Sequence, residues 1–183
     1  MSDHERDKQL ERDRYEARAA AILTASQLEN LELPGATGVP EDLRAPYSTY
    51  ENHILRLSRP GIEVLDVCCG NGQHSLISAA RGARVSVSDI APQNVELTLR
   101  RAALAGWEFQ GKVADAEHLP WPDASFDLIT CAGSLSYVDH LVFSAKYPAC
   151  FVQKIILSTL IRSTTIQSIA LTDICIIAVG GAA

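Results

Sequence analysis

Residues 62–75 combine an acid, a glycine-rich turn and a helix start in a pattern that suits the binding of a nucleotide cofactor. The apolar run 62–67 predicts a buried parallel strand that contains one acid, Asp66. The following turn, residues 69–72, reads Cys-Gly-Asn-Gly, and its two glycines permit positive φ and close approach of a ligand to the backbone. A helix is expected over 73–81. A strand, such a turn and a helix N-terminus together form a nucleotide-cofactor site, although a tight turn without a ligand is the alternative.

Two further acids follow predicted strands. Asp89 ends a strand over 83–89, and Asp115 follows a strand over 107–113. Asp89 lies 23 residues after Asp66, close to the spacing of about 20 residues at which an acid accepts hydrogen bonds from ribose hydroxyls. We therefore expect Asp89 to hold a ribose, a role compatible with capping the helix that begins at residue 91, and Ile90 to lie against the adenine.

The first motif resembles that of the class I S-adenosylmethionine-dependent methyltransferases, an acid followed by small residues at alternate positions. Here these are Asp66, Cys68, Gly70 and Gly72. Cys68 replaces the usual first glycine, as in the ubiquinone and menaquinone biosynthesis branch of the family. A dinucleotide-binding fingerprint lacks the acid and needs a third glycine further on. Residues 115–127 resemble the Asp-Ala-x-x-Leu-Pro-aromatic-x-Asp-x-Ser-Phe-Asp signature of the type 11 small-molecule methyltransferases, and the resemblance covers about residues 47–141.

The resemblance implies an α/β fold, a Rossmann-like doubly wound and mostly parallel sheet with helices on both faces, and S-adenosyl-L-methionine as the cofactor. It implies that Asp115 accepts from the adenine amino group and that the N–H of Ala116 meets a ring nitrogen. The helix before the first motif covers the methionine end in related enzymes, which makes Tyr47 and Tyr50 candidates to line it; packing against the sheet edge explains them equally well. Cys131, at the end of a strand over 127–131, is expected to face the same crevice.

No catalytic residue can be assigned from the sequence. Methyl transfer from a sulfonium is a one-step displacement that depends mainly on orientation, and a general base helps only when the acceptor is a hydroxyl or an acidic carbon. Tyr137 and His140 are the nearest candidates, but packing or surface exposure is the favoured interpretation of both. His74 is expected to be a wall of the pocket, and no metal cluster is apparent.

Composition excludes several other functions. The 183 residues fit one domain, and the net charge of −6 argues against general nucleic-acid binding. The five cysteines contain no Cys-x-x-Cys spacing, which suits a reducing cytoplasm and neither a disulfide framework nor a zinc site. The charged N-terminus predicts no signal peptide. The expected partner is a small-molecule methyl acceptor, a membrane is not expected to be one, and the oligomeric state is not indicated.

Two flanking regions complete the expected organisation: a helical extension and loop over 1–46, and an atypical apolar tail over 142–183. Ion pairs at helical spacing predict a partly exposed helix over about 4–29, with a lid or dimer arm as the functional alternative to a plain surface helix. Ser48, with Glu51 three residues later, predicts the start of a second helix that runs to about residue 57. This helix is expected to turn Ile54, Leu55 and Leu57 inward.

The tail has three interpretations. It is a divergent replacement for the fifth strand and its helix, the product of a changed reading frame, or a membrane anchor over 166–183, against which Asp173 counts. Loss of the fifth strand would expose an edge of the fourth. The functional alternatives are therefore an active small-molecule methyltransferase, a cofactor-binding but catalytically silent fragment, and, less favoured, a nicotinamide-dependent enzyme.

Overall fold

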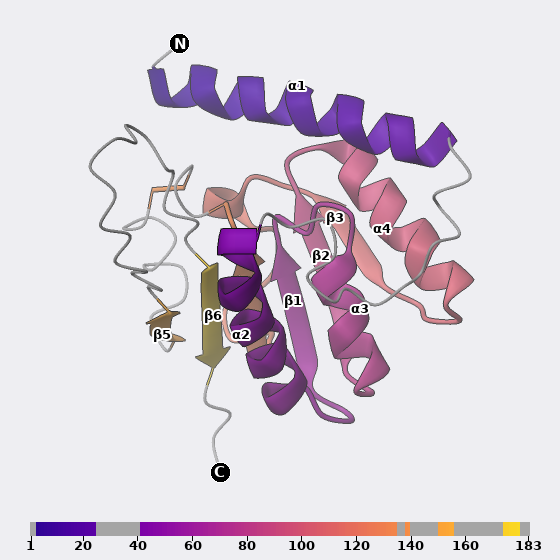
Figure 1. Ribbon diagram of the computed structural model, residues 1–183, viewed down its shortest axis with the longest axis vertical. Helices are drawn as coiled ribbons and strands as arrows, with labels where there is room; N and C mark the ends of the chain where they lie inside the picture. Colours follow the sequence, from indigo (N-terminus) through magenta and orange to yellow (C-terminus); the bar gives the residue numbers. More distant parts are fainter. Residues whose placement is uncertain (1–2, 25–40, 135–137, 140–149, 156–173, 180–183) are drawn as a thin grey trace.

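The computed structural model describes residues 3–24, 41–134, 138–139, 150–155 and 174–179 (Figure 1). Its elements, in chain order, are α1 (Asp3–Thr24), α2 (Glu41–Leu57), β1 (Glu63–Val67), α3 (Gln73–Ala80), β2 (Arg84–Asp89), α4 (Pro92–Leu104), β3 (Gln110–Val113), the 3₁₀ helix η2 (Ala116–His118), β4 (Leu128–Ala132), β5 (Cys150–Ile155) and β6 (Ile174–Val179).

The strands form one sheet in the order β3-β2-β1-β4-β6-β5. Strand β1 is parallel to both β2 and β4, and β2 is parallel to β3. Parallel neighbours need long crossover connections, and helices α3 and α4 supply two of them. The register places Asp66 opposite Val87 on one side and Thr130 on the other. The Rossmann-like, mostly parallel sheet expected from the sequence is confirmed.

The edge of β4 is not free, which corrects the expectation of an exposed strand. Strand β6 pairs antiparallel with β4 over five residue pairs, and β5 pairs antiparallel with β6. Both strands come from the apolar tail, so the tail takes part in the sheet and supports the interpretation of a replacement for the missing strand. Residues 174–179 are strand, not part of a helix over 166–183. Among the described residues, no helix is long and apolar enough to cross a membrane.

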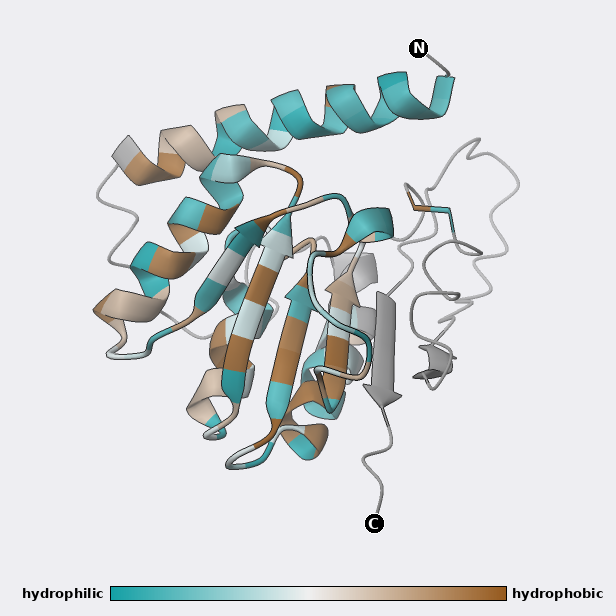
Figure 2. Cartoon of the chain, turned by 180° about the vertical axis from the view of Figure 1, so that it is seen from behind, coloured by the Kyte–Doolittle hydropathy of each residue, from teal (hydrophilic) through white to brown (hydrophobic). Residues whose placement is uncertain are grey.

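Alternating side chains of the strands bury the two faces of the sheet in separate clusters (Figure 2). Figure 2 shows brown and paler or teal residues alternating along the strands, the two-residue period expected of a sheet. On one face, Val64 and Val87 pack with residues of α2 and α3, and Leu99 of α4 joins them. On the other face, Leu65 and Ile129 pack with the segment that follows β3.

The segment after β3 behaves as its sequence signature predicts. Trp121 and Phe126 fold back on the sheet and meet edge to face, with ring centroids 5.6 Å apart. Both rings are at least nine-tenths buried. This segment therefore covers, within the described part of the chain, the face of the sheet opposite α2 and α3.

Helix α2 begins earlier than the sequence indicated. It starts at Glu41, so Ser48 lies inside the helix and the expected capping box is wrong. The hydroxyl of the neighbouring Thr49 donates a hydrogen bond to the carbonyl oxygen of Ala45, four residues earlier. Hydroxyl side chains within a helix commonly form this bond. Leu55 is 42% exposed, contrary to expectation, because the inward stripe runs through Tyr50 and Ile54, both fully buried.

The sequence of residues 91–106 predicts a helix whose buried side is formed by Val95, Leu97, Leu99, Ala102, Ala103 and Leu104. In α4, Val95, Leu97 and Ala102 are buried, but Leu104, the last residue of the helix, is 52% exposed.

Helix α1 lies across the end of the sheet to which the carboxyl ends of β1 and β2 point, and it passes over α4 (Figure 1). Among its described side chains, Ala19 is the fully buried apolar one, at 1% exposure. Figure 2 shows that the rest of the helix is mostly hydrophilic. The position over the strand ends favours the lid alternative for this helix.

The turn between β1 and α3 yields a stability prediction. Gly72 has φ of 77°, and a Cβ there would lie 2.7 Å from the Thr98 methyl group. Gly106 has φ of 79°, and a Cβ at that residue would have nothing within 4 Å. Gly106→Ala should therefore cost only the backbone strain, about 1 kcal/mol, and Gly72→Ala about 1–3 kcal/mol more, because it adds overpacking. Urea denaturation measures both; equal losses would contradict the proposed contact with Thr98.

Candidate cofactor site

A cavity of about 330 Å³ lies at the carboxyl ends of the parallel strands, a size typical of small-molecule sites. The turn after β1 lines it with Cys68 and Gly70, and the end of β2 with Asp89 and Ile90. Helix α1 closes it from the other side. The strand ends of a doubly wound sheet are where ligands of this fold class bind.

The turn after β1 is held in a left-handed conformation. Cys68, Gly70 and Gly72 have φ of 56°, 55° and 77°. The N–H of Cys69 donates to the carbonyl oxygen of Ser88 at 3.0 Å, which ties the turn to β2. Burial raises the pKa of the Cys69 thiol well above its usual range, so this sulfur stays protonated and packs as an apolar group.

Asp89 binds the turn from the end of β2. One of its oxygens accepts from the N–H of Gly70 at 3.0 Å, and the other from the N–H of Ala91 at 2.9 Å. Burial raises the pKa of Asp89, and these backbone donors act in the opposite direction. The carboxylate thus closes a turn just before α4, whose N-cap is Ala91 without a side-chain hydrogen bond, so the expected helix cap is wrong. The same carboxylate lines the cavity.

Two side chains of α4 fix the turn and were missed from the sequence. Thr98, fully buried, donates its hydroxyl to the carbonyl oxygen of Gly70 at 3.2 Å. Arg101 donates to the carbonyl oxygen of Asn71 at 2.8 Å, and burial lowers the pKa of its guanidinium. Their positions, three residues apart on one helix face, are the only sequence signal that could have indicated this role.

Asp66 lies beneath the turn and outside the cavity lining. Its oxygens accept hydrogen bonds from the hydroxyls of Ser75 in α3 and Thr130 in β4, the latter at 2.8 Å. Burial raises the pKa of Asp66 to about 6, although both hydroxyls act to lower it. The side chain therefore supports the turn from below and does not face a ligand.

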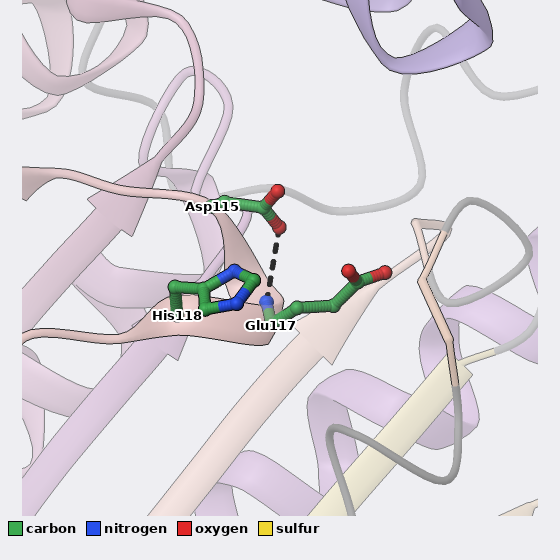
Figure 3. Close-up of side chains that lie close together, drawn as sticks. All are labelled: Asp115, Glu117 and His118. Carbon is green, nitrogen blue, oxygen red and sulfur yellow. Dashed lines mark hydrogen bonds between the residues drawn. The ribbon is translucent and has the colours of Figure 1, made fainter. Parts of the chain in front are cut away.

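Asp115 caps the 3₁₀ helix that follows β3. One of its oxygens accepts from the N–H of Glu117 at 3.0 Å, as Figure 3 shows. The other oxygen accepts from Lys8 of α1 at 2.8 Å. Asp115 and Ala116 line the cavity on the far side of the β2 end, as expected.

Asp115, Glu117 and His118 bring ligand-type atoms within 4.8 Å of one another (Figure 3). No metal-ligand spacing in the sequence had indicated this group. Both carboxylates form ion pairs with the Lys8 ammonium, at 2.8 and 2.7 Å. A cation at this position would have to displace Lys8, so the cluster is better described as an ion-pair network.

His74 stands at the other end of the cavity among aromatic rings. Its ring stacks on that of Tyr47 at 6.0 Å and meets the edge of Tyr50 at 4.9 Å. Burial lowers the pKa of His74 to about 4, so the imidazole is neutral near pH 7 even though Glu51 lies 3.9 Å from its Nε2 atom. Tyr47 and His74 line the cavity, which agrees with the expectation of a pocket wall.

The structure brings most of the expected site residues to one cavity. Its lining includes seven of them: Tyr47, Cys68, Gly70, Asp89, Ile90, Asp115 and Ala116. Four others lie behind the lining: Tyr50, Asp66, Gly72 and Cys131. Tyr137 and His140 fall outside the described residues.

Comparison with known proteins agrees with this arrangement. The family model of a methyltransferase domain matches residues 64–147. Residues 64–147 are thus similar to a methyltransferase domain. The fold is similar to that of geranyl diphosphate C-methyltransferase from Streptomyces coelicolor. This match covers 72% of this chain and 58% of that enzyme, with 17% identity and a TM-score of 0.52.

The sequence matches cover only part of the length of each relative. An uncharacterised protein of Mycobacterium tuberculosis is 39% identical over 82 residues, which span 44% of this chain and 30% of that protein. A ubiquinone biosynthesis O-methyltransferase of Xanthomonas axonopodis pv. citri is 33% identical over 119 residues, 63% of this chain and 50% of that enzyme. The matched segments thus span 30% and 50% of the length of these two curated relatives.

The raised pKa of Asp66 predicts a pH dependence of stability. Because its folded-state pKa is about 6 and its ordinary value 3.8, the folded chain gains a proton first as the pH falls. The stability contributed by this proton is complete below pH 4 and is lost as the pH rises through 6. Between pH 7.5 and pH 5 the free energy of unfolding of the wild type should rise by about 1 kcal/mol relative to Asp66→Asn, which cannot titrate.

Chemical denaturation at several pH values measures this difference. Subtracting the variant removes the contributions of other titrating groups. A constant difference from pH 7.5 to pH 5 would show that Asp66 does not titrate in this range.

Proposed function

We propose that the chain binds S-adenosyl-L-methionine in this cavity and transfers its methyl group to a small-molecule acceptor. The observation that supports this most is the convergence of the glycine-rich turn, Asp89 and Asp115 on one cavity. The methyltransferase family of residues 64–147 supports the reaction class. The names of two relatives, a demethylmenaquinone methyltransferase and a ubiquinone biosynthesis O-methyltransferase, favour a small organic acceptor.

In this proposal each lining residue contacts a different part of the cofactor. Asp89 accepts from the ribose hydroxyls, with Ile90 against the adenine. Asp115 and the N–H of Ala116 recognise the adenine edge. The turn at Gly70 receives the methionine portion, which Tyr47 covers from α2.

The bound cofactor would supply an activated methyl group on a sulfonium, so the chain has mainly to bind and orient. Orientation alone can contribute an effective molarity on the order of 10⁵ M. The neutral His74 and the ring of Tyr47 give that end of the cavity an uncharged aromatic wall. No described residue is assigned as a general base, and Tyr137 and His140 keep the status of sequence-based candidates.

A catalytically silent, cofactor-binding fragment is the second candidate. It is favoured by the edge of β4, where an antiparallel strand stands in place of a fifth parallel strand. A nicotinamide-dependent enzyme is the third, and the acid before the turn together with the absence of a third glycine counts against it.

Calorimetry with S-adenosylhomocysteine and with NAD separates these candidates. Binding of S-adenosylhomocysteine alone is the expected result, and binding of NAD alone would overturn the proposal. Formation of S-adenosylhomocysteine from the cofactor with a panel of phenols and quinols then distinguishes an active enzyme from a silent fragment.

The ribose role of Asp89 gives a direct prediction. Hydrogen bonds to a charged carboxylate contribute about 1.5–3 kcal/mol each, so Asp89→Ala should weaken binding of S-adenosylhomocysteine at least tenfold in calorimetry. Asp89→Asn keeps a side-chain oxygen that can accept from the backbone N–H of Ala91, but it lacks the negative charge. It should also bind S-adenosylhomocysteine more weakly, because hydrogen bonds to a neutral acceptor are weaker than those to a carboxylate.

Glu96→Ala is the matched control, since this exposed acid of α4 pairs with Arg100 and does not line the cavity. It should leave the affinity unchanged. Circular dichroism must show that each variant is folded. A folded Asp89→Ala chain with wild-type affinity would remove Asp89 from the ribose role.

A further inference from the structure

One stripe of α1 faces the cofactor cavity. Six of its residues line the cavity, and they follow the three- and four-residue spacing of one helix face: Lys8, Glu11, Tyr15, Arg18, Ala19 and Ile22. The stripe runs almost the whole length of α1, which ends at Thr24. A ligand that reaches Asp89 and Asp115 therefore lies beneath this helix.

The two ends of α1 are held by different interactions. Toward its C-terminal end the helix packs on α4, where Ala19 is buried. Toward its N-terminal end the Lys8 ammonium bridges two carboxylates, Asp115 at 2.8 Å and Glu117 at 2.7 Å. We refer to these three side chains as the Lys8 clasp.

The clasp is partly withdrawn from solvent. The side chains of Lys8 and Glu117 are 14% and 9% exposed. Burial acts to lower the pKa of Lys8, but the two carboxylates raise it overall, so the lysine is charged near neutral pH. Glu117 also accepts from the N–H of Asp139 at 2.7 Å and pairs with His4 at 3.1 Å.

These contacts make the N-terminal half of α1 the part that is held by charge and not by apolar burial. They can therefore open without loss of the apolar contact with α4. Asp115 belongs to both the cavity and the clasp, because it lines the cavity and also accepts a hydrogen bond from Lys8.

On the basis of the proposed function, we propose that α1 is a lid over the cofactor cavity and that the Lys8 clasp holds it closed. The adenosyl ligand enters and leaves when the clasp opens. Lys8 is a positioning residue in this scheme, since it acts through α1 and the two carboxylates. Because the clasp closes the cavity both with and without a ligand beneath it, weakening the clasp speeds entry and exit alike.

Stopped-flow binding of S-adenosylhomocysteine tests the lid. In Lys8→Met both the association and the dissociation rate constants should rise about tenfold, and the dissociation constant should change less than threefold. Hydrogen exchange of α1 amides, without ligand, should be faster in the variant. Lys8→Arg, which keeps the charge, should restore both rates to near the wild-type values.

Arg12→Met is the matched control. It removes a positive charge from the same helix, but Arg12 pairs with Glu16 within α1 and does not line the cavity. Its rates should equal those of the wild type. Where Lys8→Met does not fold, Glu117→Gln provides the test, because Glu117 belongs to the clasp and does not line the cavity; both rates should rise in this variant.

Unchanged rates in Lys8→Met, or in Glu117→Gln where it takes the place of that variant, would overturn the lid while leaving the proposed cofactor intact. A rise in the association rate alone, with tighter binding, would also overturn it, because Lys8 would then simply compete with the ligand for Asp115. A rise in the dissociation rate alone would overturn it in favour of direct ligand contact. No binding by the wild type would overturn the proposed function, and this inference with it.

Discussion

The cavity at the strand ends depends on a buried carboxylate that does not line it. Asp66 joins three elements, since it lies in β1 and accepts from Ser75 of α3 and Thr130 of β4. Burying a charged carboxylate costs free energy unless hydrogen bonds satisfy its oxygens. The two hydroxyls offset only part of this desolvation cost for Asp66, and its pKa is therefore raised. The side chain thus fixes where the turn leaves β1 and where α3 begins. Any ligand held by the backbone of the turn depends on it indirectly.

A second layer of polar contacts holds the turn from above and from the side. Asp89 binds the N–H of Gly70, and Thr98 binds the carbonyl oxygen of the same residue. Both groups of one glycine are thereby satisfied from two different elements, β2 and α4. Arg101 does the same for the carbonyl oxygen of Asn71. The turn is therefore preorganised, and a ligand need not order it on binding.

Local sequence patterns predicted the sheet because each strand, turn and helix of residues 62–132 can be recognised from its own short stretch of residues. The acids at the strand ends could be placed together because parallel strands end at one edge. The start of α2 and the exposed Leu55 could not be placed, since a local capping pattern at Ser48 competed with an apolar stripe that extends further back. The contact between Lys8 and Asp115 joins residues 107 positions apart, and only the spacing of the α1 stripe hinted at it.

The β4 edge of the cavity differs from what a fifth parallel strand would provide. Because β6 is antiparallel to β4, Ala132 at the carboxyl end of β4 pairs with Ile174, the first residue of β6. Ala132 lines the cavity, so this edge of the site is where β6 begins and not where a parallel strand ends. A parallel neighbour would instead bring its carboxyl end to this edge, as β1 and β2 do on the other side of β4. The part of the cavity formed by β1 and β2 therefore follows the usual geometry of a doubly wound sheet, whereas its edge at β6 does not.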